Sequence, residues 1–219
     1  MIPQVYSALG NEDAALSAFY TALSKLPKGE SSYITVLYNI GLYESIKGKY
    51  DKSEFAFKEL LELDPNDYQS NAKLIQVYFA RKEYEKATPL KKKLYAAHSK
   101  GILQDNLKDM FCFDQFRWNN KLIQVFEKYA EPEGKVYYKH IFYVLDEDGE
   151  IELSVQTENS PISIEQGGAK YLVGMRKGSG HSTFNVGFNQ NPDYDKLKQT
   201  VIDILEGKIK PVASSQLGK

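Results

Sequence analysis

The sequence predicts an α+β protein whose first half consists of helical hairpins and whose second half is an antiparallel β-meander closed by a terminal helix. Three observations lead to this prediction. An apolar pattern with helical spacing in residues 37–65 recurs, in weaker form, 34 residues later. Beyond residue 109 the apolar positions become aromatic and β-branched and are interrupted by short turn signals. Residues 193–206 then return to helical spacing and end at Gly207, a residue typical of helix C-termini.

Composition excludes several classes of function. The net charge of −1 provides no basic field for nucleic acid, so no nucleic-acid partner is expected. No apolar run approaches the roughly 18 residues that a membrane span requires, so the sequence predicts a soluble chain. The single cysteine, Cys112, excludes an internal disulfide and a zinc site built on several thiolates. We expect no cofactor.

The first helix is predicted between Gly10 and Pro27. Ala15, Phe19 and Ala22 recur on one face, and proline closes the helix. Nine residues precede Gly10, too few for a full partner helix, so we expect the chain to begin within a hairpin. Further repeats before Met1 and export as a processed precursor both stay open, and the sequence does not choose a compartment.

Residues 37–65 contain the clearest hairpin. Gly41 allows two antiparallel helices to approach closely, and Gly48 supplies the turn between them. Large side chains fill the space between the helices, and Pro65 cannot continue the second helix. These side chains are Leu37, Ile40, Tyr50, Phe57 and Leu60.

The same positions 34 residues later predict a second, distorted hairpin over residues 71–95. Leu74, Tyr78 and Leu94 keep the apolar pattern, but Gly41 is replaced by Ile75. Pro89 lies where the second helix of this hairpin should already be running. We therefore expect Thr88 to cap that helix, with Pro89 in its first turn.

The motif formed by Leu37, Ile40-Gly41, Gly48-Lys49-Tyr50, Phe57, Leu60 and Pro65 resembles the tetratricopeptide repeat (TPR). The resemblance covers about two and a half repeats. It implies a scaffold without catalytic activity that binds a protein or peptide in a groove lined by the first helix of each hairpin. The residues expected on this groove are Tyr38, Asn39, Leu42, Ser45, Ile46, Gln69, Ala72, Lys73, Gln76 and Phe79.

Polar side chains raise two narrower hypotheses about the partner. Asn39 and Lys73 resemble two positions of the clamp with which some TPR proteins hold a terminal carboxylate, although the other clamp positions differ. Arg81, Lys82, Lys86 and residues 91–93 make the second hairpin basic, which suits either a solvated face or an acidic partner segment.

The second half begins after a join at residues 101–109. Residues 110–118 and 122–129 predict a hairpin around Asn119-Asn120, and residues 136–145 and 150–157 predict another around residues 146–149. Residues 160–173 suit either a short helix or strands, and residues 183–188 predict a further strand, giving four or five in all. A helix over residues 193–206 closes the sheet.

We therefore expect repeats over residues 1–100, a join over 101–109, a β-rich domain over 110–210 and a loose tail over 211–219. The segments FCFDQF, YYKHIFYVLDEDG and GHSTFN of the second half resemble uncharacterised bacterial TPR-associated domains. That resemblance implies no activity, and the sequence does not determine an oligomeric state.

Chemistry-bearing residues in the second half are sparse. Cys112, His140 and Asp114 are the types of a thiol nucleophile, its base and an orienting group, but no helix start or glycine-rich turn is present to activate the thiol. His98, His140 and His181 lack metal-ligand spacing. We therefore predict no catalytic and no metal-binding residue.

The alternative hypothesis is a small-ligand sensor or enzyme in the β domain, with a pocket near Trp118, His140 and His181 and the repeats as a recruitment module. A third is a purely structural chain whose repeats pack on their own β domain.

Overall fold

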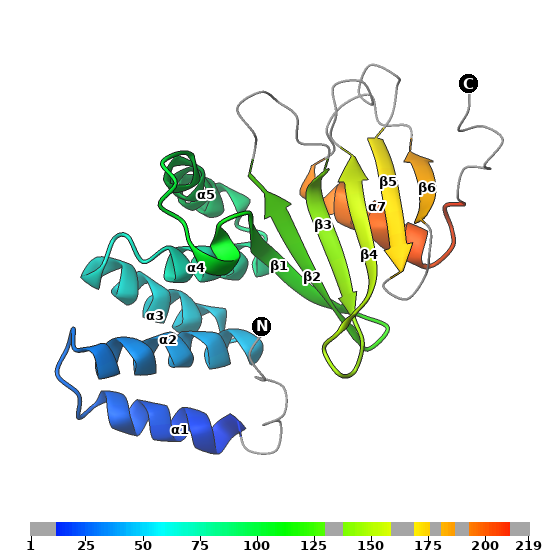
Figure 1. The fold of residues 1–219 in the computed structure, drawn as a ribbon. Coiled ribbons are helices and arrows are strands. Elements are labelled where there is room, and N and C mark those ends of the chain that lie inside the picture. Colours follow the sequence, from blue (N-terminus) through cyan, green and yellow to red (C-terminus); the bar gives the residue numbers. More distant parts are fainter. Residues whose placement is uncertain (1–11, 130–137, 159–168, 176–180, 187–192, 211–219) are drawn as a thin grey trace. The chain divides into compact units, whose positions relative to one another are not determined.

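The computed structural model describes residues 12–129, 138–158, 169–175, 181–186 and 193–210 (Figure 1). The chain divides into two compact units, Met1–Lys108 and Asp109–Lys219. In their described parts, the first unit is helical and the second is an antiparallel sheet with one long helix (Figure 1). This arrangement confirms the predicted α+β class.

The helical unit contains five α-helices within its described part, and each packs against the next along the chain. They are α1 (Glu12–Leu23), α2 (Ser31–Ile46), α3 (Tyr50–Leu63), α4 (Tyr68–Ala80) and α5 (Tyr84–Ser99). The tandem α2–α3 and α4–α5 hairpins confirm the predicted helical repeats. The expectation of a shortened helix before Gly10 concerns residues outside the described part of the chain.

The α2–α3 hairpin forms for the reasons that the sequence indicates. Leu37, Phe57 and Leu60 are at most 2% exposed and make the core between the two helices. Gly48 has φ +70° at the turn, a conformation that glycine adopts without strain. Helix α4 then starts behind Asp67, whose side chain accepts a hydrogen bond from the Ser70 amide at 3.0 Å.

The predicted start of the last repeat helix is wrong. Helix α5 begins at Tyr84, and Pro89 lies inside it rather than in its first turn. The Thr88 hydroxyl donates to the Tyr84 carbonyl at 3.2 Å, so Thr88 is a helical residue and not the cap. Burial explains the earlier start, because Ala87 is fully buried and the Tyr84 ring lies 5.0 Å from that of Phe79. These contacts outweigh the hydrogen bond that proline cannot make.

The second unit contains a six-stranded antiparallel sheet with the strand order β1-β2-β3-β4-β5-β6, an open meander. The strands are β1 (Met110–Trp118), β2 (Lys121–Lys128), β3 (Tyr138–Leu145), β4 (Ile151–Glu158), β5 (Ala169–Met175) and β6 (His181–Val186). Asn119 and Asn120 adopt positive φ at the first turn, as predicted. The expectation of four or five strands was too low because β5 lies in the stretch that the sequence left open.

Helix α7 (Tyr194–Leu205) packs on one face of this sheet (Figure 1). The Asp193 side chain caps its start by accepting from the Lys196 amide at 2.8 Å, and Gly207 with φ +71° follows its end. Leu197, Val201 and Ile204 form its buried stripe. The sheet residues with buried aliphatic or aromatic side chains on the same side include Phe111, Phe113, Ile123, Val125, Phe142 and Val155.

None of the described helices combines the length and the apolar character that crossing a bilayer requires.

Candidate functional site

The predicted groove residues of α2 lie on the side of that helix turned away from its buried stripe of Leu37, Ile40 and Glu44. Ile46 is the most accessible of them at 38% exposure, and Tyr38, Asn39 and Leu42 are half-buried. The side chains therefore offer a mixed aliphatic, aromatic and amide surface.

Two of these α2 side chains are held by their own unit. The Tyr38 ring meets the Phe57 ring edge-on at 5.7 Å. Burial, with a smaller effect of the Asp67 negative charge, raises the pKa of Tyr38 to about 12. The Tyr38 hydroxyl is thus neutral at physiological pH. The Asn39 amide donates to the Thr35 carbonyl at 2.8 Å, one turn back along the helix.

The predicted groove residues of α4 are more strongly engaged. Gln69 donates at 2.9 Å to Asn106, which lies in the short 3-10 helix η1 (Asp105–Leu107). Lys73 donates to Gln76 at 3.3 Å. Phe79 is only 8% exposed and packs against Tyr84, and the ammonium group of Lys91 lies 5.8 Å from its ring centre. Ala72 is also buried, so α4 presents less open surface than α2.

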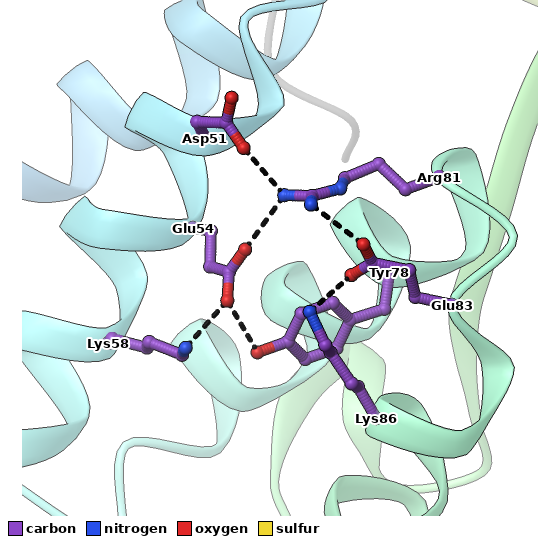
Figure 2. A network of polar contacts seen from close by, with 7 residues as sticks. All are labelled: Asp51, Glu54, Lys58, Tyr78, Arg81, Glu83 and Lys86. Carbon is purple, nitrogen blue, oxygen red and sulfur yellow. Dashed lines mark hydrogen bonds and ion pairs between the residues drawn. The ribbon is translucent and has the colours of Figure 1, made fainter.

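A network of ion pairs joins α3, α4 and α5 (Figure 2). One terminal nitrogen of Arg81 lies 2.8 Å from Asp51 and 2.9 Å from Glu54, and the other lies 2.7 Å from Glu83. The second oxygen of Glu54 accepts from Lys58 at 2.6 Å and from Tyr78 at 3.1 Å (Figure 2). Every terminal atom of the Arg81 and Glu54 side chains is therefore used within this unit.

The network lowers the pKa of two of its acids, Glu54 and Glu83. Burial alone would raise the pKa of Glu54, but hydrogen bonds from Lys58 and Tyr78 outweigh it and lower that pKa. The hydrogen bond from Lys86, 2.9 Å away, is the main reason that the pKa of Glu83 is lowered. Both groups are therefore carboxylates at neutral pH.

This network could not be predicted from the sequence because its members are separated by up to 35 residues, and their pairing depends on how the helices pack. It changes the interpretation of the basic hairpin. Arg81 and Lys86 are neutralised by carboxylates of their own unit, and Lys93 donates to the Pro65 carbonyl. Of the other cations on this hairpin, Lys82 and Lys92 are exposed and Lys91 is half-buried.

In the sheet unit the three residues considered for thiol chemistry are separated. The Asp114 carboxylate receives the Tyr194 hydroxyl and the Lys198 ammonium group, the latter at 2.9 Å. The His140 ring lies 3.4 Å from Glu127. Glu127 and His140 are opposite each other in the β2–β3 register, whereas Cys112 pairs with the next residue, Phe126. Cys112 and His140 consequently point to opposite faces of the sheet.

The described residues include no group of three or more histidine, cysteine, aspartate or glutamate side chains placed to hold a metal ion. Of the three histidines, His98 belongs to α5, His140 to β3 and His181 to the start of β6.

The fold of the first unit is that of a helical-repeat protein, and the comparison with known families agrees. A family model described as tetratricopeptide repeat matches residues 34–67, which include most of α2 and all of α3. Residues 34–67 thus match a tetratricopeptide repeat, and the tandem helices around them fit a TPR protein. No match was found among curated proteins or among solved structures. TPR repeats in general form scaffolds for protein–protein interaction and are typically not catalytic.

Proposed function

We propose that the helical unit binds an extended peptide or a partner helix in a groove lined by α2 and α4, and that the protein acts as a scaffold without catalysis. The observation that carries this proposal is the match to a tetratricopeptide repeat at residues 34–67, whose first helix has exposed Ile46 and half-buried Leu42 on the groove side. Burial of such aliphatic side chains contributes about 25 cal/mol per Å² of apolar area. Half-buried Tyr38 and Asn39 beside them add ring area and an amide acceptor.

Within the proposed groove the two helices have different roles. Gln69, Lys73, Gln76 and Phe79 of α4 contact neighbours in their own unit and give that wall a defined shape. The α2 residues supply the accessible area. Partner contacts should therefore be concentrated on Leu42 and Ile46, while replacement of Phe79 should act mainly by destabilising the unit.

The sheet unit is proposed to act as a second structural or interaction unit. In support, the Asp114 carboxylate is occupied by Tyr194 and Lys198, and Cys112 and His140 lie on opposite faces of the sheet. We also propose the boundaries expected from the sequence, with repeats to residue 100, a join over 101–109 and a β domain to residue 210. Burial of Leu103 and Leu107 and the Gln69–Asn106 hydrogen bond support a join that packs on the helical unit.

The test is selection of binders from a phage library of random 12-residue peptides against the intact chain. Selected peptides are then measured against a Leu42→Glu, Ile46→Glu variant and against a Glu62→Gln control, an exposed change on another helix. We expect the groove variant to lose at least about tenfold in affinity, because buried anchors dominate interfaces, and the control to bind normally. Equal binding to the intact chain and the groove variant would show that the groove is not the binding site.

A further inference from the structure

A hollow of about 330 Å³ lies between α1, α2 and α3. Its walls and floor are mainly apolar, formed by Tyr20, Leu23, Leu37, Ile40, Phe55 and Ala56, and the charged side chains of Asp51 and Lys52 complete the lining. Phe55 is 68% exposed and Tyr20 is 39% exposed, so both rings are accessible at the rim of the hollow. An exposed aromatic ring beside an apolar hollow is typical of an interaction surface.

This hollow is distinct from the proposed peptide groove. Its floor is the Leu37–Ile40 stripe of α2, whereas Tyr38, Leu42 and Ile46 are turned to the other side of the same helix. A partner bound in the hollow would leave the groove accessible.

A buried carboxylate, Glu44, lies behind the wall of the hollow, in contact with two of the residues that line it, Tyr20 and Lys52. Glu44 follows Ile40 by one helical turn on the same stripe and is fully buried. One of its oxygens accepts from the Tyr20 hydroxyl at 2.7 Å and lies 3.7 Å from the Lys52 ammonium group. Its other oxygen, Oε2, has no hydrogen-bond partner among the described residues. A buried carboxylate oxygen without a donor is costly, so this atom indicates where a donor would bind.

The next helix interface provides an internal reference. The hydrogen bond between Tyr20 and Glu44 joins α1 to α2, and these residues are 24 apart in the sequence. The hydrogen bond between Glu54 and Tyr78 joins α3 to α4 over the same sequence separation, with glutamate first and tyrosine second. Lys52 and Lys86, 34 residues apart, each lie over the tyrosine ring of their interface, at 5.8 Å and 5.6 Å. Both interfaces thus contain a tyrosine, a glutamate and a lysine.

The two interfaces differ in one cation. Arg81 reaches Oε2 of Glu54 at 2.9 Å and so completes that carboxylate. The residue 34 positions earlier is Lys47, which pairs with Asp13 of α1. Among the described residues, the guanidinium group that completes the second interface therefore has no counterpart at the first.

We propose that the hollow between α1, α2 and α3 is a second docking site, which takes a segment of a partner protein carrying an arginine next to a large apolar side chain. The apolar side chain fills the hollow against Phe55 and Ile40, and the guanidinium donates to Oε2 of Glu44. Arginine suits this position better than lysine because its planar fork is weakly hydrated and can donate to more than one acceptor. Lys52, whose side chain is 60% exposed, is the group that the guanidinium displaces.

The probes are two end-blocked dipeptides, leucine-arginine and leucine-citrulline, which differ in charge but hardly in shape. Each is titrated into the intact ¹⁵N-labelled chain while backbone amide shifts are recorded. We expect saturable shifts at Ile40, Glu44 and Ala56 with the arginine dipeptide and at least about tenfold weaker binding of the citrulline dipeptide. Glu44→Gln should bind both equally, and Glu62→Gln, an exposed change on α3, should behave as the intact chain.

Several results would overturn the proposal. The first is the absence of any amide shift in the hollow, and the second is equal affinity for the two dipeptides. The third is a set of shifts confined to Leu42 and Ile46, which would place the dipeptide in the groove. Concentration-dependent shifts of Ile40 and Ala56 without any dipeptide would assign the hollow to a second copy of the chain instead. If Glu44→Gln does not fold, Phe55→Ala serves in its place. That exposed substitution should weaken both dipeptides, and unchanged binding to it would refute the site.

Discussion

At the scale of single residues, Gly41 shows how tightly the repeat is packed. A Cβ atom at this position would lie 2.8 Å from the Phe57 ring, which is fully buried and has no space to move aside. Two effects compete on substitution. Replacing glycine by alanine inside a helix stabilises by about 0.5 to 1 kcal/mol, whereas overpacking a core costs about 1 to 3 kcal/mol. The steric effect is the larger.

We therefore predict that Gly41→Ala lowers the free energy of unfolding by about 1 to 2 kcal/mol, measured by urea denaturation. Ser45→Ala on the same helix is the control, since Ser45 is half-buried and alanine has the higher helix propensity. That variant should be as stable as the intact chain or slightly more so. A Gly41→Ala variant that matches the control would mean that the close approach of α2 and α3 is not rigid.

At the scale of elements, a β-bulge determines how α7 is attached. The register between β1 and β2 shifts between Cys112 and Asp114, so Phe113 and Asp114 both face the helix. The Phe113 ring meets the Tyr194 ring at 5.1 Å, and Asp114, 2% exposed, accepts from Tyr194 and Lys198. Lys198 also lies 3.8 Å from the centre of the Phe116 ring. One strand irregularity thus provides an ion pair and two ring contacts for the helix.

We predict that Asp114→Asn destabilises the sheet unit by about 2 to 3 kcal/mol, somewhat less than the loss of a fully buried ion pair because Lys198 is 27% exposed. Amide hydrogen exchange in α7 should accelerate more than in α2 to α5. Asp148→Asn, in the exposed β3–β4 turn, is the matched control and should change neither quantity. Unchanged protection of α7 in Asp114→Asn would show that the apolar stripe alone holds the helix.

At the scale of the whole molecule, stability depends on tyrosines and carboxylates that are linked to one another. Tyr20, Tyr33 and Tyr38 each have a pKa raised to about 12, through burial for Tyr20 and Tyr38 and chiefly through the hydrogen bond to Glu59 for Tyr33. The pKa values of Glu54 and Glu59 are lowered by their lysine and tyrosine donors, which outweigh the effect of burial. The folded state therefore prefers neutral tyrosine and ionised glutamate.

The sign of the pH dependence follows by linkage. Because the folded state lowers the pKa of Glu54 and Glu59, their contribution is complete above the unfolded value near 4.5 and is lost as the pH falls through their folded values. Because the folded state raises the tyrosine pKa values, that contribution is complete below pH 10 and is lost as the pH rises to about 12. We predict that the urea midpoint falls in both windows. A Tyr20→Phe, Tyr33→Phe, Tyr38→Phe variant should lose less stability between pH 10 and 12 than the intact chain, and an equal alkaline loss would contradict this assignment.

Local sequence signals predicted much of the fold. The 34-residue recurrence located the helices from α1 to α5, and Gly48, Asn119-Asn120 and Gly207 marked turns and a helix end, because each depends on only a few neighbouring residues. The groove residues were expected from the resemblance to TPR repeats, and their role in binding a partner stays a prediction. The start of α5 at Tyr84 was not predictable, since burial of Ala87 and the contact with Phe79 come from residues outside the local window.

The sequence by itself thus determined the α+β class, the repeat period and the positions of the main turns. Only the tertiary structure decided that residues 169–175 form β5 and that Asp114 contacts α7 rather than His140. It also decided that Arg81 completes Glu54, while Oε2 of Glu44 has no such donor among the described residues. The physical reason is the sequence distance over which each kind of interaction acts. Periodicity and turn chemistry act over a few residues, whereas strand pairing, ion-pair partners and buried donors depend on segments brought together by packing.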